Sequence, residues 1–232
     1  MHMYDDTTVV IPTLNEAKNI GVLLKVLEKR YDEISVIVAD DGSKDGTQEV
    51  VRKFSKANKH IFLLDRSGKP KGLTASVLDG VMHAKTKFLV VMDADLQHPP
   101  EVIKAIVHEL KNGAPVAVGT RIEKPDDWGF FRFLASDSAV WLGRLRLRLG
   151  GAYARDVVSG FFGVNAKLFK NQIESHARRF VPEGYKVCLD LLKTLPRKTH
   201  VAEVPYSFEL RKEGVSKMGT RQIVAYIKSL LT

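Results

Sequence analysis

Phe88-Leu-Val-Val-Met-Asp-Ala-Asp-Leu-Gln97 is an apolar run that ends in two carboxylates one residue apart. The pattern predicts a buried strand whose functional end faces solvent. Carboxylates next to such a run are costly to bury without a positive partner, because an unpaired buried charge costs several kcal/mol. Oxygen ligands alone, from Asp93, Asp95 and the amide of Gln97, suit Mg²⁺ or Mn²⁺ and not zinc. The alternative is a turn at a strand end whose acidic side chains are only solvated.

The composition is that of a globular protein with one large domain or a domain with an appendage. The chain has 232 residues, 44% of them hydrophobic and 27% charged, which is enough for a substantial core. Its 36 Lys and Arg residues exceed its 27 Asp and Glu residues and give a net charge of +9. This charge favours anionic partners such as phosphates, nucleic acid or an acidic membrane surface. The basic residues are spread along the chain without an RNA- or DNA-binding motif, so we expect no nucleic-acid partner.

The single cysteine, Cys188, excludes a disulfide framework and a cysteine metal site. It lies in the apolar pattern 187–192, which predicts a core thiol and not a nucleophile. No signal peptide opens the chain, and no apolar run reaches the roughly 18 residues of a membrane span. We therefore expect a cytoplasmic protein, with contact to a membrane surface still open.

Strand and helix patterns alternate along the first half of the chain. Short strands are predicted at residues 8–11, 35–39, 61–64 and from residue 88 onward. Each is followed by apolar residues at helical spacing. Four such units within about 110 residues predict a mostly parallel sheet with helices on both faces, because parallel strands need helical crossovers.

Polar loops follow three of these strands, at residues 12–16, 40–43 and 93–97. In parallel sheets ligands bind at the carboxyl ends of the strands, where all three loops lie. No G-x-G-x-x-G follows the first strand and no Walker lysine loop is present, which disfavours a redox dinucleotide or P-loop phosphoryl transfer. We therefore predict an acid-lined nucleotide site that handles its diphosphate through a metal.

With these motifs the chain resembles the family 2 glycosyltransferases of the GT-A fold, and within them the dolichyl-phosphate mannose synthases and related polyprenyl-phosphate glycosyltransferases. The resemblance covers residues 8 to 217, in the family's order. The matching segments are 12–16, 40–43 with 45–47, 68–73, 92–101, 119–121, 159–161, and 204–211 with 214–217. It implies a single α/β catalytic domain over 1–217, with a Rossmann-like, mostly parallel central sheet. The nucleotide-sugar half would span about 8–120 and the acceptor half about 121–217.

The resemblance also implies a role for each matching residue. The base and ribose of a GDP-sugar would contact Pro12, Leu14, Glu16 and Asp40. The diphosphate and its Mg²⁺ or Mn²⁺ would contact Asp93, Ala94, Asp95 and Gln97, with Asp93, Asp95 and Gln97 as metal ligands. Arg211 and Lys217 would close over the donor. The acceptor phosphate would meet Arg121, and also Arg132 unless that arginine is only a solvated surface residue. The catalytic residues would thus be Asp95, Arg121 and Arg132.

The implied reaction is transfer of mannose from GDP-mannose to dolichyl or another polyprenyl phosphate. A metal held by Asp95 and Gln97 would neutralise the charge that develops on the departing GDP. The acceptor phosphate is already an anion and needs no general base, which agrees with a helix at 183–190 that lacks the Glu-Asp pair of many relatives. Direct attack predicts inversion and a β-linked lipid phosphate sugar. Cations are needed because two unit charges repel by roughly 3 kcal/mol at about 5 Å and an effective dielectric near 20.

Two segments, 128–134 and 140–149, interleave bulky apolar residues with arginines. This composition is typical of a membrane interface, or else of core packing with the arginines reaching outward. Residues 218–232 are predicted to form an amphipathic helix that places Ile223, Val224, Ile227, Leu230 and Leu231 on one face. That helix could lie on a surface or dock on the domain. We expect peripheral association with the cytoplasmic face of the membrane, and membrane subunits are potential partners.

Two positions depart from the family pattern. Ser136-Asp137 stands where relatives usually have a Ser-Arg pair, and Phe162 stands where an arginine usually follows Ser159-Gly-Phe161. The loss of two cations on the acceptor side would fit a different acceptor or a different sugar. Nothing in the base pocket separates guanine from uracil either, so two alternatives to the mannosyl reaction stay open. One is a UDP-sugar donor such as UDP-glucose with the same fold. The other is a non-catalytic subunit that binds a nucleotide sugar.

Overall fold

A mixed sheet of seven strands forms the centre of the computed structural model, which describes residues 3–123, 130–207 and 220–232. The strand order is β3-β2-β1-β4-β6-β5-β7. The strands are β1 (Thr7–Thr13), β2 (Ser35–Asp40), β3 (Ile61–Asp65), β4 (Phe88–Val91), β5 (Val116–Glu123), β6 (Phe162–Asn165) and β7 (Val201–Ser207).

The first four strands pair in parallel, and β5 pairs in parallel with β7, so the predicted mostly parallel sheet is confirmed. The exception is β6, which runs antiparallel between β4 and β5. β6 thereby joins the first half of the chain to the second within one sheet.

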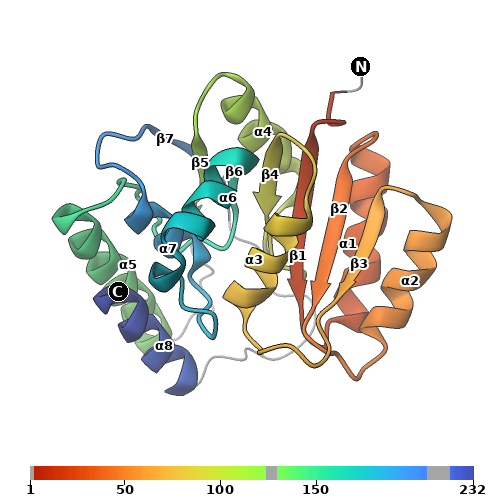
Figure 1. Cartoon of the computed structure of the whole chain (residues 1–232), viewed down its shortest axis with the longest axis horizontal. Coiled ribbons are helices and arrows are strands. Elements are labelled where there is room, and N and C mark those ends of the chain that lie inside the picture. Colours follow the sequence, from red (N-terminus) through yellow and green to blue (C-terminus); the bar gives the residue numbers. More distant parts are fainter. Residues whose placement is uncertain (1–2, 124–129, 208–219) are drawn as a thin grey trace.

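Helices cover both faces of the sheet (Figure 1). They are α1 (Ala17–Arg30), α2 (Thr47–Ala57), α3 (Leu73–His83), α4 (Ile103–Lys111), α5 (Phe130–Leu149), α6 (Ala166–Ser175), α7 (Val187–Thr194) and α8 (Thr220–Leu231), with short 3₁₀ helices at Pro100–Val102 and Ala177–Arg179.

Each sheet face has its own hydrophobic core. On one face α1, α2 and α4 pack on alternate residues of β1, β2 and β4, while α3, α5, α6 and α7 pack on the other. In α1 the predicted helical spacing is confirmed: Ile20, Leu23, Leu24 and Leu27 are at most 1% exposed. Burying each such side chain contributes about 1.5–3 kcal/mol. Cys188 is fully buried in the second core, as predicted, and burial raises the pKa of its thiol.

The carboxyl ends of β1, β2, β3 and β4 meet at one edge, at the bottom of the molecule in Figure 1. The loop after each strand therefore opens on the same rim. The three polar loops singled out in the sequence all lie there, because their strands are parallel neighbours.

The last helix, α8, lies against α5 and buries Ala225, Tyr226 and Ser229 (Figure 1). Its larger apolar residues do not all share that contact. Leu230 packs on the core, whereas Ile223, Val224, Ile227 and Leu231 are 50–82% exposed. A helix is thus present at 220–231, and its amphipathic character remains a prediction.

Candidate active site

The turn after β4 carries the predicted metal ligands. Asp95 is 6% and Gln97 7% exposed, and the backbone N–H of Gln97 donates to Asp95 Oδ1 at 3.2 Å. Leu96 between them has a φ of 62°, in the left-handed region that a leucine adopts only when its surroundings hold it there. Leu96 is 8% exposed. The packing of this leucine therefore fixes the shape of the turn that presents Asp95 and Gln97.

His98 holds the other end of this turn. Its Nδ1 accepts a hydrogen bond from the backbone N–H of Asp93 at 3.1 Å, and its ring stacks on Phe161 with centroids 5.0 Å apart. Burial lowers the pKa of His98 to about 4, so the ring is neutral at pH 7. The sequence marks His98 only as part of a motif. The structure shows it as a positioning residue for Asp93.

The residues of this turn fit a hard divalent cation. In the described part of the chain no three His, Cys, Asp or Glu side chains cluster in a way that could hold a metal alone. Mg²⁺ is commonly held by one or two carboxylates together with substrate phosphates. Asp93, Asp95 and the amide oxygen of Gln97 supply such an incomplete set of oxygen donors, which a nucleotide diphosphate would complete.

Asp40, at the end of β2, is fully buried and accepts hydrogen bonds on both carboxylate oxygens. The donors are the hydroxyls of Thr13 and Ser43, the backbone N–H groups of Gly42 and Ser43, and the side-chain amide of Gln48. These donors come from the end of β1, from the loop after β2 and from the start of α2. The predicted contact of Asp40 with the donor's ribose remains a prediction, and in this structure the carboxylate shapes the loop after β2.

The loops after β1 and β2 are tied to each other. The N–H of Asn15 donates to Ser43 Oγ at 2.8 Å, and the N–H of Glu16 donates to Thr47 Oγ1 at 2.9 Å. Pro12 is buried at the end of β1, and Leu14 and Glu16 are half-buried on the rim. The predicted nucleotide-binding residues of this loop therefore lie together at the carboxyl edge, on a backbone held by side chains of the neighbouring loop.

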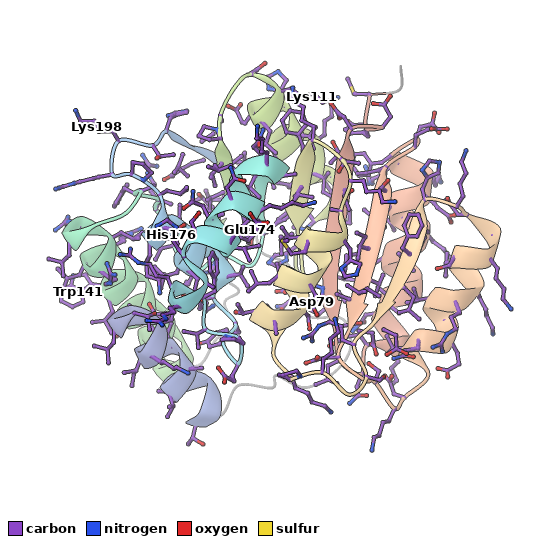
Figure 2. The ribbon with its side chains drawn as sticks, in the orientation of Figure 1. Asp79, Lys111, Trp141, Glu174, His176 and Lys198 are labelled. Atoms are coloured by element: carbon purple, nitrogen blue, oxygen red, sulfur yellow. The ribbon has the colours of Figure 1, made fainter. Side chains whose placement is uncertain are left out.

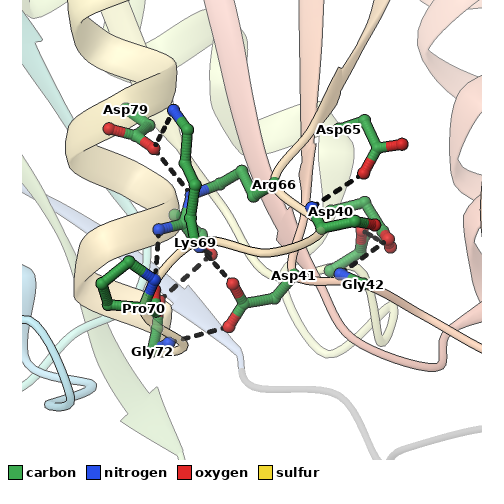
Figure 3. Close-up of polar contacts among 12 residues, drawn as sticks. Asp40, Asp41, Gly42, Asp65, Arg66, Lys69, Pro70, Gly72 and Asp79 are labelled. Atoms are coloured by element: carbon green, nitrogen blue, oxygen red, sulfur yellow. Dashed lines mark hydrogen bonds and ion pairs between the residues drawn. The ribbon is translucent and has the colours of Figure 1, made fainter.

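A buried arginine that the sequence did not single out organises the next loop (Figure 3). Arg66 is 2% exposed; it pairs with Asp41, and its other donors reach Asp79 at 2.8 Å and the carbonyl of Pro70 at 3.0 Å. The N–H of Gly72 completes the network by donating to Asp41 at 2.7 Å. This network fixes the glycine-lysine loop at 68–72 against the loop after β2.

The same loop contacts the segment that leads into α7. The N–H of Thr74 donates to the carbonyl of Gly184 at 3.0 Å, and the N–H of Ala75 to that of Pro182 at 3.1 Å. A Cβ at Gly72 would lie 2.0 Å from the Pro182 oxygen, so only glycine permits this approach. Residues 72–75 and 182–184, which are distant in sequence, are therefore in direct contact here.

Arg121 of β5, which the sequence predicts to meet the acceptor phosphate, is held by a carboxylate. Its guanidinium donates to both oxygens of Asp156, at 2.6 and 2.9 Å, a planar bidentate pair. Asp156 is 5% exposed and the Arg121 side chain 12%. The His98 ring also lies 6.1 Å from that of Tyr206, the residue of β7 that pairs with Arg121 of β5, so the turn after β4 and Arg121 are neighbours across this ring.

Other predicted residues lie elsewhere. Arg211 and Lys217 fall outside the described residues, and Arg132 lies in α5 at a position whose side chain is likewise not described. Phe162, noted as a departure from the family, is 1% exposed in β6 and packs near Phe169. Phe162 is a core residue and pairs with Val91, the last residue of β4.

Three comparisons place the chain among known proteins. The glycosyl transferase family 2 model matches residues 8–172. The dolichol-phosphate mannosyltransferase of Pyrococcus furiosus is 34% identical over 96% of this chain, which spans 62% of that relative's length. The protein of the same name from Saccharomyces cerevisiae is 32% identical over 96% of this chain and 85% of its own length.

Solved structures agree on the fold. Glucosyl-3-phosphoglycerate synthase from Mycobacterium tuberculosis, crystallised with Mn²⁺, UDP-glucose and glycerol 3-phosphate, superposes with a TM-score of 0.63 at 18% identity. The match covers 90% of this chain and 73% of that one, and at this identity it shows the GT-A fold alone. Together with the sequence matches, it shows that the chain belongs to glycosyl transferase family 2, as the motifs of the rim predicted.

Proposed function

We propose that this protein transfers mannose from GDP-mannose to dolichyl or another polyprenyl phosphate, with a divalent metal and with inversion at the sugar. The curated relatives named for this activity support the proposal. The observation that carries it is the arrangement around His98: its ring accepts a hydrogen bond from the backbone of Asp93 and lies 6.1 Å from that of Tyr206, which pairs with Arg121 in the sheet. That arrangement suits a reaction in which one phosphate leaves while another attacks.

On the donor side Asp93, Asp95 and Gln97 would hold the metal, which supplies Lewis-acid stabilisation of the leaving diphosphate when bound. The left-handed turn at Leu96 and the hydrogen bond from Asp93 to His98 keep these side chains in place before substrate arrives. Such preorganisation is where electrostatic catalysis gains most, because the site does not have to reorganise during the reaction.

On the acceptor side Arg121 would bind the lipid phosphate while Asp156 fixes the plane of its guanidinium. The acceptor is an anion and needs no base. Asp190, the acid of the helix where many relatives carry their base, is 1% exposed and bonded to Lys193 at 2.9 Å. It is engaged in the core and so is not placed to take a proton from a substrate.

We place the reaction at the membrane surface because of the apolar side chains on α5 and α8. Trp141, on the outer side of α5, is 62% exposed (Figure 2), and Leu149 is 82% exposed. Ile223, Val224, Ile227 and Leu231 extend this surface along α8. Within the described residues no helix is both long and apolar enough to cross a bilayer. A basic chain with an apolar two-helix surface suits shallow insertion among anionic headgroups.

The direct test is incubation of the protein with labelled GDP-mannose, a polyprenyl phosphate and Mn²⁺, followed by lipid extraction. We expect label in the lipid phase that depends on metal and acceptor, in an acid-labile β-linked product. A parallel reaction with labelled UDP-glucose identifies the donor. Label from UDP-glucose alone would overturn the mannosyl assignment, and donor binding without transfer from either donor would identify a non-catalytic subunit.

A further inference from the structure

Lys186 stands immediately before α7, at the side of the site where Arg121 and Asp156 meet. Its ammonium donates to the carbonyl of Val158 at 3.1 Å and lies 4.4 Å from the centroid of the Tyr185 ring. Val158 follows Asp156 by two residues, so this contact brings the lysine onto the loop that holds Arg121. The residue as a whole is half-buried.

This ammonium lacks the partners that a buried cation normally has. An ammonium has three N–H donors, and among the described residues only one carbonyl accepts from it and no carboxylate forms an ion pair with it. Buried charges in proteins are usually paired and fully hydrogen-bonded, because leaving them unmatched is costly. The surroundings of Lys186 within the protein thus stabilise its charge poorly.

The electrostatics of the pocket agree with that geometry. Burial, and then the positive charge of Arg121, lower the pKa of Lys186 to about 8, while Asp156 and Asp93 act in the opposite direction. Lys186 and Arg121 are thus two neighbouring cations, and the Asp156 carboxylate pairs with Arg121 alone. An anion arriving between them would relieve the repulsion and fill the open donors of the lysine.

We propose that Lys186 binds a phosphoryl oxygen of a substrate, as a second cation beside Arg121. The inference rests on the proposed function, in which both substrates carry phosphates: the diphosphate of the donor and the monoester of the acceptor. Either would present the same oxygen chemistry to the ammonium, which acts as a compact point charge with rotatable donors. Lys186 is then a substrate-binding residue and not merely a support for the Val158 carbonyl.

Brief acetylation of the wild-type protein, read out by mass spectrometry, tests the contact without requiring turnover. One arm adds GDP with Mn²⁺, and the other adds a short-chain polyprenyl phosphate alone. We expect Lys186 to be protected at least tenfold in one arm, which identifies the phosphate it binds. Lys170, on α6, is the matched control. Its ammonium also donates to a backbone carbonyl, that of Ala84, at 2.6 Å. Equal labelling of Lys186 with and without both ligands would overturn the inference.

Variants then separate binding from support. Lys186→Met should weaken the protecting ligand at least tenfold in calorimetry, Lys186→Arg should restore most of that loss, and Lys170→Met should leave it unchanged. If all three bind like the wild type, Lys186 has only a structural role. If Lys186 is protected but the protein transfers no sugar, the proposed function is refuted and the phosphate contact of Lys186 stands. If Lys186→Met transfers sugar at the wild-type rate, the contact is refuted and the proposed function stands.

Discussion

At the scale of single residues, Arg121 is defined by the carboxylate that holds it. The arginine side chain has several rotamers, and the bidentate pair with Asp156 selects one of them. The two residues are 35 positions apart in the sequence, so no local pattern predicts their pairing. Arg121 could be predicted because a family motif contains it, while Asp156 could not.

Asp156→Asn should therefore impair the acceptor and spare the donor. The amide keeps the size of the side chain but removes its charge and one of its two acceptor oxygens, so Arg121 loses its fixed plane. We expect kcat/KM for the lipid phosphate to fall by about 10- to 100-fold, or roughly 1.4–2.7 kcal/mol of transition-state stabilisation. GDP affinity in calorimetry should stay within about twofold. Arg121→Ala should remove turnover with equally little effect on GDP, and a matching loss of GDP affinity in either variant would contradict this division of roles.

Gly160 offers a second test at this scale. A Cβ added there would lie 2.9 Å from Asp93 Oδ2 and 3.2 Å from His98 Cε1, so Gly160→Ala must displace one of them. We expect metal-dependent GDP binding to weaken by about tenfold while the protein stays folded. Gly150→Ala is the control, because no atom lies within 4 Å of its added Cβ. Equal Mn²⁺ dependence in the two variants would show that the position of Asp93 does not matter.

The part of the site that could be predicted consists of residues in contiguous motifs. Asp93, Asp95 and Gln97 follow one strand, and the structure places them in one turn. His98, Arg66, Asp156 and Lys186 act through partners that are distant in sequence, or through the backbone of another residue. Their importance follows from burial and pairing, which a single sequence does not display.

At the scale of elements, α8 is attached to the domain by buried polar contacts as well as by Tyr226 and Leu230 in the core. Lys193 of α7 is fully buried; its ammonium pairs with Asp190 at 2.9 Å and donates to Thr232 Oγ1 at 3.0 Å and to the carbonyl of Ser229. The Ser229 hydroxyl in turn donates to Asp190. The helix can therefore dock while leaving most of its larger apolar side chains outside.

Lys193→Met should destabilise the protein strongly. The substitution leaves Asp190 buried without its cation, and breaking such a pair costs about 3–5 kcal/mol. Chemical denaturation should show this loss in the free energy of unfolding, whereas the double variant Asp190→Leu/Lys193→Met should recover much of it because no buried charge remains. If the single variant is as stable as the wild type, the pair does not secure α8.

A strand or helix could be predicted where the spacing of its own apolar residues identifies it. The run Thr8–Ile11 and the helix carrying Ile20 to Leu27 bury one face each, so their periodicity is visible in the sequence. β6 was not predicted, because its four residues, Phe162–Asn165, show no alternation of apolar and polar side chains. It is defined by its pairing with β4 and β5. Its antiparallel direction follows from where the chain returns, which is a property of the tertiary structure.

At the scale of the whole molecule, most of the large apolar side chains that are exposed among the described residues lie on α5 and α8, which pack on the same face of the sheet. We expect the protein to co-sediment with vesicles that contain anionic lipid. Trp141→Ser/Ile227→Ser should weaken that binding by about tenfold or more, since each large apolar side chain contributes about 1.5–3 kcal/mol when buried. Phe62→Ser, at a residue 53% exposed on β3, is the control. Equal loss of binding in the control would mean that the interaction is not directed by this surface.

The proposed reaction depends most on a divalent cation held at the rim while a sugar diphosphate departs. Crystals grown with GDP-mannose and Mn²⁺, measured at the manganese edge, test this directly. We predict one anomalous peak within about 2.0–2.3 Å of an Asp95 oxygen and the Gln97 amide oxygen, bridged to the diphosphate. A nucleotide bound with its metal elsewhere, or a donor seated away from Asp95 altogether, would contradict the central claim.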